Sequence, residues 1–216
     1  MKNIYISYLP VFFLAFICYG CAGIPSQHKQ HSMLTNECDH EADLALKAQD
    51  YEESILLHQR YIEGETSNGV AMYHLGYSYG QIGNHDKEIY YYEKAIQLGF
   101  YKFGIFFNLG MAYGEMGQYR ESVRVFKKGL ELEPGRSDNH FGLALTYQRL
   151  SSNKLAEDEF LKAIEIDPDN MDARYYLGVL YIETGEKEKA EKQLEKMLEI
   201  DPDSFMVNEL KIKLRQ

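Results

Sequence analysis

Cysteine has the most distinctive chemistry in this sequence, because its thiolate binds metal ions and forms disulfides. The three cysteines, Cys18, Cys21 and Cys38, all lie near the N-terminus. No second CxxC pair and no His-x-x-x-His follows Cys18 and Cys21, so the spacing does not indicate a structural zinc site. A disulfide framework is equally unsupported, since removal of an N-terminal leader would leave Cys38 without a partner.

Histidine is the next candidate metal ligand. His28, His31, Cys38 and His40 are close enough in the sequence to be considered together. Their surroundings are polar and aperiodic, which favours a solvated linker that runs into the start of a helix. The other histidines are scattered, at His58, His74, His85 and His140. We therefore expect neither a metal site nor a bound cofactor.

The sequence also lacks the patterns of common enzymes. No Ser or Cys stands in the context of a nucleophile elbow, and no glycine-rich loop joins a strand to a helix. Two acidic pairs flank prolines, Asp167 with Asp169 and Asp201 with Asp203, but neither has EF-hand spacing. We therefore expect a non-catalytic protein.

The net charge of −10 limits the partners. Proteins that bind nucleic acids carry clustered lysine and arginine, which neutralise phosphates. Anionic lipid surfaces likewise attract basic segments. We therefore expect no nucleic acid partner, and any association with a membrane needs a mechanism other than charge.

The first 20 residues have the pattern of a secretion signal. Lys2 precedes a mostly apolar run from Ile4 to Ile17. This run suits the apolar region of a signal peptide and is shorter than the roughly 20 residues that a membrane-spanning helix needs. Residues 1–20 are predicted to be a signal peptide and the polar residues 21–34 a flexible tether.

The residues around Cys21 resemble the lipobox of bacterial lipoproteins, in which a cysteine after a small residue is lipidated. Gly20 precedes Cys21, while Cys18 stands where the motif prefers leucine. The resemblance implies lipidation of Cys21. Because Ala22 rather than aspartate follows, it also implies an outer-membrane anchor that faces the periplasm. Two alternatives stay open: cleavage after Ala22, which would give a soluble periplasmic or secreted protein, and an uncleaved membrane anchor.

Beyond the tether, the sequence repeats with a period of 34 residues. A shift by one period superimposes a leucine, an aromatic residue, a residue that is usually glycine, and a large apolar residue. The aligned sets are Leu75, Leu109, Leu143 and Leu177; Tyr79, Tyr113, Tyr147 and Tyr181; Gly83, Gly117, Ser151 and Gly185; and Tyr92, Phe126, Phe160 and Leu194.

Each copy has helical spacing. In one copy, Leu75 and Tyr79 indicate a first helix, and Ile89 and Tyr92 indicate a second. Gly83 stands between them, where glycine accepts the left-handed conformation that ends a helix. Three copies end in a proline, which cannot continue a helix: Pro134, Pro168 and Pro202.

This period and pattern resemble the tetratricopeptide repeat, a helix-turn-helix unit of 34 residues. The resemblance implies an all-α, right-handed solenoid. We predict a repeat array over residues 35–204, which consists of a degenerate repeat at 35–68 and clear repeats at 69–102, 103–136, 137–170 and 171–204.

Residues 205–216 are predicted to form a helix that caps the array. The apolar residues expected to cover the open end are Phe205, Val207, Leu210 and Leu214. Two residues inside the array, Glu88 and Met197, replace small residues of the pattern. We expect the packing of their repeats to adjust there.

In tetratricopeptide repeat proteins, the first helix of each repeat lines a concave groove in which ligands bind. The corresponding positions of this sequence form two apolar rows. The first row is Tyr73, Phe107, Phe141 and Tyr175, and the second is Tyr77, Met111, Leu145 and Val179. Neither row contains the lysine or asparagine with which family members grip a C-terminal carboxylate. The rows favour an apolar or amphipathic helix as ligand, although the first row is also common as packing between helices.

These features predict an adaptor at the cell envelope that binds protein partners. Resemblance to bacterial repeat lipoproteins suggests one of two roles: assembly of pilus or secretion machinery, or organisation of cell-wall hydrolases. The alternative is a structural homo-oligomer, in which the groove or the capping helix is buried against another copy.

Overall fold

The structure is a computed structural model that describes residues 39–64, 68–102 and 104–215. The predicted signal peptide, the tether and Cys21 lie outside these residues. Within the described residues, no helix is both long enough and apolar enough to cross a membrane.

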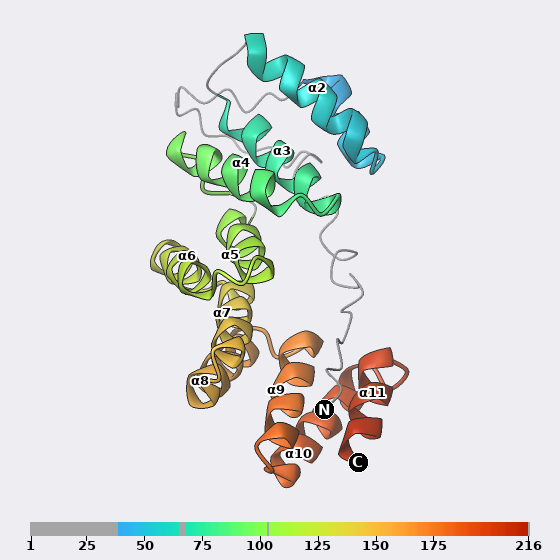
Figure 1. Cartoon of the computed structure of the whole chain (residues 1–216). Coiled ribbons are helices and arrows are strands. Elements are labelled where there is room, and N and C mark those ends of the chain that lie inside the picture. Colours follow the sequence, from blue (N-terminus) through green and yellow to red (C-terminus); the bar gives the residue numbers. More distant parts are fainter. Residues whose placement is uncertain (1–38, 65–67, 103, 216) are drawn as a thin grey trace, which may run out of the picture.

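All regular structure in the described residues is α-helical, and the helices come in pairs. The first helices of the pairs are α1 (His40–Lys47), α3 (Gly69–Gln81), α5 (Ile105–Glu115), α7 (Ser137–Arg149) and α9 (Met171–Glu183). The second helices are α2 (Tyr51–Gly64), α4 (His85–Gln97), α6 (Tyr119–Leu132), α8 (Asn153–Ile166) and α10 (Lys187–Ile200), and α11 (Phe205–Leu214) follows them. Figure 1 shows the pairs in chain order along a curved array. The fold is an all-α helical repeat solenoid with a capping helix, as the period of the sequence predicts.

The turn inside each pair repeats one backbone conformation. Gly83, Gly117 and Gly185 have φ values of 75°, 70° and 80°, in the left-handed region. Ser151 occupies the same register with φ of 55°, and Gln49 of the first pair has φ of 62°. The left-handed residue that ends a helix therefore recurs in all five pairs, including the first, where the sequence keeps little of the pattern.

Rings from the second helices fill the space between successive first helices. Phe126 of α6 is fully buried, and its ring lies between Gly110 of α5 and Gly142 of α7. A Cβ atom at Gly110 would lie 2.6 Å from this ring, and one at Gly142 would also overlap it. Glycine at both positions lets two consecutive first helices contact the same ring, which ties one repeat to the next.

The capping helix α11 buries one face against the last pair. Val207, Leu210 and Leu214 lie in the same buried apolar cluster as Met197 of α10. Met197 is fully buried. The inner repeats have small residues at the corresponding position, namely Ala95, Gly129 and Ala163. The longer side chain of Met197 fills the space at this end of the array.

Phe205 does not cover the end of the array, and this part of the prediction is wrong. Its side chain is 74% exposed. Helical spacing places Phe205 on the face of α11 opposite Val207 and Leu214, because residues two and nine positions apart lie about half a turn apart. α11 also departs from the pattern of a first helix, because Lys211 occupies the position at which the repeats have Leu75, Leu109, Leu143 and Leu177.

Ser151→Gly should stabilise the protein, because a non-glycine residue in the left-handed region is strained by about 1 kcal/mol. We expect the melting temperature to rise by about 2–4 °C in a protein of this size. Gly117→Ser is the matched reverse change, since a Cβ at Gly117 meets no atom within 4 Å and only the backbone is tested. It should lower the melting temperature by a similar amount. Thermal unfolding followed by circular dichroism measures both, and a lower melting temperature for Ser151→Gly would contradict the expectation.

Candidate functional site

The first predicted row lies mainly between helices. Phe141 of α7 and Tyr175 of α9 are only 6% and 8% exposed and belong to a buried apolar cluster. Phe107 of α5 is half-buried, with its ring centroid 6.2 Å from that of Phe126. These side chains hold neighbouring helices together and offer little surface to a ligand.

Tyr73, the remaining member of the first row, joins three helices. Its ring centroid lies 5.6 Å from that of Tyr92 in α4 and 5.3 Å from that of Phe100, in the connection after α4. Its hydroxyl accepts a hydrogen bond of 3.1 Å from Nδ2 of Asn108 in α5. Burial raises the pKa of the Tyr73 hydroxyl well above its usual value, so this group stays protonated at neutral pH.

The second row is the more accessible of the two. Tyr77, Met111, Leu145 and Val179 are all half-buried and come from four consecutive first helices. Tyr77 packs edge-to-face on Tyr51 of α2 at 6.3 Å, and Leu145 and Val179 pack against the buried cluster. The remaining surface of these side chains forms an apolar row along the array.

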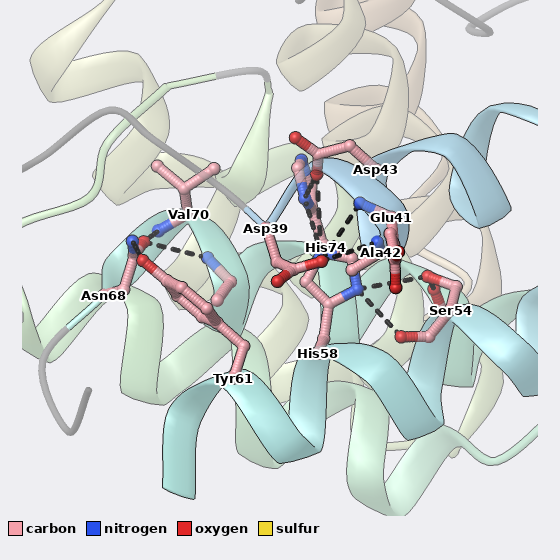
Figure 2. Close-up of polar contacts among 12 residues, drawn as sticks. Asp39, Glu41, Ala42, Asp43, Ser54, His58, Tyr61, Asn68, Val70 and His74 are labelled. Atoms are coloured by element: carbon pink, nitrogen blue, oxygen red, sulfur yellow. Dashed lines mark hydrogen bonds and ion pairs between the residues drawn. The ribbon is translucent and has the colours of Figure 1, made fainter. Parts of the chain in front are cut away.

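A third set of side chains, which sequence reasoning missed, lies where α1, α2 and α3 meet. Figure 2 shows Asp43, His58 and His74, one from each helix, pointing toward one another. Nε2 of His58 lies 3.1 Å from Nδ1 of His74 and 3.5 Å from Oδ1 of Asp43, and Nδ1 of His74 lies 3.1 Å from the same oxygen. The expectation that the histidines are scattered is therefore wrong for His58 and His74.

Burial and charge at this polar cluster are unusual for the interior of a helical array. His58 is fully buried and His74 nearly so. Burial lowers the pKa of His74, which favours the neutral ring. Burial by itself would raise the pKa of Asp43, but the two imidazole rings outweigh it and hold this pKa well below its usual range. The cluster therefore combines a carboxylate with two imidazole rings in a mostly dry environment.

The sequence does contain a signal for this cluster. His58 stands one period before Tyr92, in the register where later repeats carry a large buried residue. Asp43 stands one period before Tyr77, in the register of the second row. Two polar residues in apolar registers of the same repeat indicate that they meet a polar partner, since an unpaired buried polar group is costly.

A second buried ionisable pair lies in the next repeat. Glu88 of α4, which replaces a small residue of the pattern, is 5% exposed. Its carboxylate lies against Gly80 of α3, where any Cβ would overlap it, and Nδ1 of His85 is 2.8 Å away. A glycine on the facing helix and a histidine partner thus accommodate Glu88 without a change of fold.

The stacked helix pairs and the apolar surface on their first helices define a helical repeat scaffold. The chain belongs to the tetratricopeptide repeat family, whose pattern matches residues 70–98, 103–136 and 152–214, together more than half of the 216 residues. Proteins of this family bind protein or peptide partners and are generally non-catalytic interaction scaffolds.

Solved structures of other repeat proteins share the fold. YrrB, described as a TPR protein with an unusual peptide-binding site, is 24% identical with a TM-score of 0.64, over 79% of this chain and 88% of its own. A structure of MamA is 21% identical with a TM-score of 0.69, over 82% and 99%. A thermophilic TPR protein from Thermus thermophilus is 19% identical with a TM-score of 0.65, over 82% and 96%. At these identities the similarity shows the fold alone. The search of curated proteins finds no match.

The stability contributed by the His85–Glu88 pair should fall as the pH rises. The hydrogen bond to Glu88 raises the pKa of His85, and burial raises the pKa of Glu88. A group whose pKa is raised on folding stabilises the protein below its unfolded pKa and loses that contribution as the pH passes its folded pKa. The unfolded values are about 4.3 for Glu and about 6.5 for His.

Thermal unfolding of wild type and Glu88→Gln, at about pH 5.5 and about pH 8.5, tests this pair on either side of the ordinary histidine pKa. We expect the melting temperature of wild type relative to Glu88→Gln to be lower at the higher pH. His85→Gln serves as the second variant, because it removes the partner and leaves the carboxylate. A relative stability of wild type that increases with pH would contradict the raised pKa values.

Proposed function

We propose that this protein is a non-catalytic scaffold at the cell envelope that binds an apolar or amphipathic segment of a partner protein along the second row. The observation that carries the proposal is the partly exposed apolar surface of Tyr77, Met111, Leu145 and Val179 on four consecutive first helices. Apolar side chains that stay partly exposed at the same position of several repeats are typical of an interaction site. The family's general role and the peptide-binding site of YrrB support the same proposal.

An amphipathic helix suits this surface. Its apolar side chains recur every three or four residues, and such a helix binds by placing this face on an apolar surface. The net charge of −10 favours a partner whose polar face is basic. The role that we propose for such contacts is assembly of pilus or secretion machinery or organisation of cell-wall hydrolases.

Truncation of the central members of the second row should weaken partner binding. Central anchors of an interface each cost about 2 kcal/mol or more when truncated, so Met111→Ala and Leu145→Ala should each weaken binding by about tenfold or more. Lys127→Ala, at an exposed position on α6, is the control and should bind like wild type. Phe141→Ala is unsuitable, because this ring is buried and its loss should lower stability instead.

The measurement has two steps. A photo-reactive amino acid at position 111 or 145 cross-links the partner in native membranes, and the same amino acid at position 127 reports background. The affinity of the identified partner segment is then measured for each purified variant. Equal affinities for wild type, Met111→Ala and Leu145→Ala, with both variants folded, would exclude the second row as the binding site.

A structural homo-oligomer is the second candidate. It is favoured by the exposed apolar residues on α11, since Phe205 is 74% and Ile212 is 57% exposed. In that case a photo-reactive amino acid at position 205 cross-links another copy of this chain, and the molar mass measured by sedimentation increases with protein concentration. A scaffold for other proteins gives cross-links to a different chain and a constant molar mass.

Lipidation of Cys21 places the scaffold at the membrane in this proposal. Each CH₂ group of an acyl chain that enters the bilayer contributes about 0.8 kcal/mol, so several chains give stable anchoring. Cys21→Ser should therefore abolish labelling with a fatty acid and release the protein from membranes or leave it unprocessed. Wild type that carries no label and begins at Gly23 would support simple secretion, and wild type that keeps residues 1–20 would support an uncleaved anchor. Cys38→Ser is the matched control and should retain the label.

A further inference from the structure

The polar cluster of Asp43, His58 and His74 has the geometry of a metal site. Its three potential ligand atoms form a triangle with sides of 3.1, 3.1 and 3.5 Å. In tetrahedral zinc sites the metal lies about 2.0–2.2 Å from nitrogen and oxygen ligands, which places the ligand atoms about 3.3–3.6 Å from one another. The triangle therefore has nearly the dimensions of one face of such a site. In the described ranges, this is the one group of three His, Cys, Asp or Glu residues close enough to share an ion.

The surroundings of His58 orient its ring for metal binding. Nδ1 lies 2.8 Å from the carbonyl oxygen of Ser54, which can only accept, so Nδ1 carries the proton. In the neutral ring this leaves the lone pair of Nε2 directed at the cluster (Figure 2). Metal-binding histidines usually donate their other N–H to a carbonyl or carboxylate in this way. The hydroxyl of Ser54 lies 3.1 Å from that of Ser78 in α3, which further connects the two helices.

Without a cation, the cluster has fewer hydrogen-bond donors than acceptors. The lone pair of His58 Nε2 and the carboxylate of Asp43 are both acceptors, and a single proton on Nδ1 of His74 could not serve both well. Oδ1 of Asp43 lies within ion-pair distance of both rings, yet among the described residues it makes no hydrogen bond of acceptable geometry. A buried carboxylate oxygen without a hydrogen bond is costly, and a bound cation would remove that cost.

We propose that Asp43, His58 and His74 bind one Zn²⁺ ion, with water as the fourth ligand. Two imidazole nitrogens and a carboxylate oxygen suit zinc, whereas Ca²⁺ and Mg²⁺ prefer ligands that are all oxygen. The side chain of Asp43 is 19% exposed and those of His58 and His74 are 0% and 9% exposed, so the ion and its water reach the site from the Asp43 side. This inference does not depend on the proposed function.

The proposed ion would stabilise the fold. It joins α1, α2 and α3 and so fastens the first helix pair to the rest of the array. α1 has only eight residues, and a helix of that length depends on tertiary contacts for its stability. Binding of zinc to the folded state alone stabilises that state by mass action.

His58→Phe is the most informative variant. It removes one ligand and supplies the residue type that Phe126 and Phe160 provide in the same register, so the helix pair should still fold. Asp43→Asn removes the charged ligand at nearly constant volume. His140→Gln is the control, because His140 also pairs with a carboxylate, Glu159 at 2.6 Å, but lies outside the cluster.

The full chain is freed of metal with a chelator and titrated with Zn²⁺ by calorimetry, and with Co²⁺ by its visible absorption. Wild type and His140→Gln should bind one ion tightly with a tetrahedral Co²⁺ spectrum. At a free Zn²⁺ concentration about 100 times Kd, their melting temperature should rise by about 5–10 °C. His58→Phe and Asp43→Asn should bind at least about 100-fold more weakly, beyond the 10–100-fold cost of losing a supporting hydrogen bond.

Two results would overturn the proposal. One is the absence of saturable Zn²⁺ binding by folded wild type. The other is equal binding by wild type, His58→Phe and Asp43→Asn, which would place any zinc on the histidines and cysteines of the N-terminal segment. Circular dichroism of each variant shows that the helices are intact.

Discussion

The whole structure depends on one packing constraint. A helix pair of this kind cannot bury its apolar face by itself, so each pair buries that face against the next pair. The ring of Phe126 shows how the constraint is met, because Gly110 and Gly142 belong to two different repeats and both contact it. Stability in such arrays is approximately the sum of the intrinsic stabilities of the repeats and of the interfaces between neighbours. The left-handed turn inside each pair sets the angle between its two helices. In the pair of α5 and α6, this angle directs the ring of Phe126 toward the glycines.

The constraint also explains the division between the two apolar rows. The first row is close to the rings of the second helices, so Phe141 and Tyr175 are drawn into the core. The second row lies one helical turn further along each first helix. Its side chains contact the core on one side only, and Met111, at the centre of the row, stays half-buried. A scaffold of this type gains surface for a ligand from the same helices that hold it together.

Much of this fold follows from short-range patterns that one sequence reveals. A left-handed turn needs glycine or a tolerated substitute at one position, and Gly83, Gly117 and Gly185 mark it clearly. Gln49 adopts the same conformation, although glutamine by itself does not indicate a left-handed residue. Phe205 shows the opposite case: composition alone favours an inward position for this apolar residue, and the helical phase puts it outside.

The polar cluster could not be predicted in the same way, because its members come from three helices and share no local motif. Asp43, His58 and His74 are about one helix apart in the sequence, and each looks like an isolated polar residue. Only the 34-residue register shows that His58 replaces a buried ring and Asp43 an apolar side chain. The distances between their ligand atoms depend on how the helices cross, and that information lies in the packing.

The C-terminal junction has a consequence for how this protein changes over evolution. Repeat arrays lengthen and shorten by duplication or loss of whole units, and a new unit must meet small residues on the helix that precedes it. The inner junctions offer Ala95, Gly129 and Ala163, so a duplicated unit could be accommodated there without further change. Behind α10 the same position is filled by Met197, and Lys211 takes the place of the leucine that a complete unit would bury. Behind α10, the side chain at position 197 therefore suits the capping helix α11, which packs on it, rather than the pattern of the inner junctions.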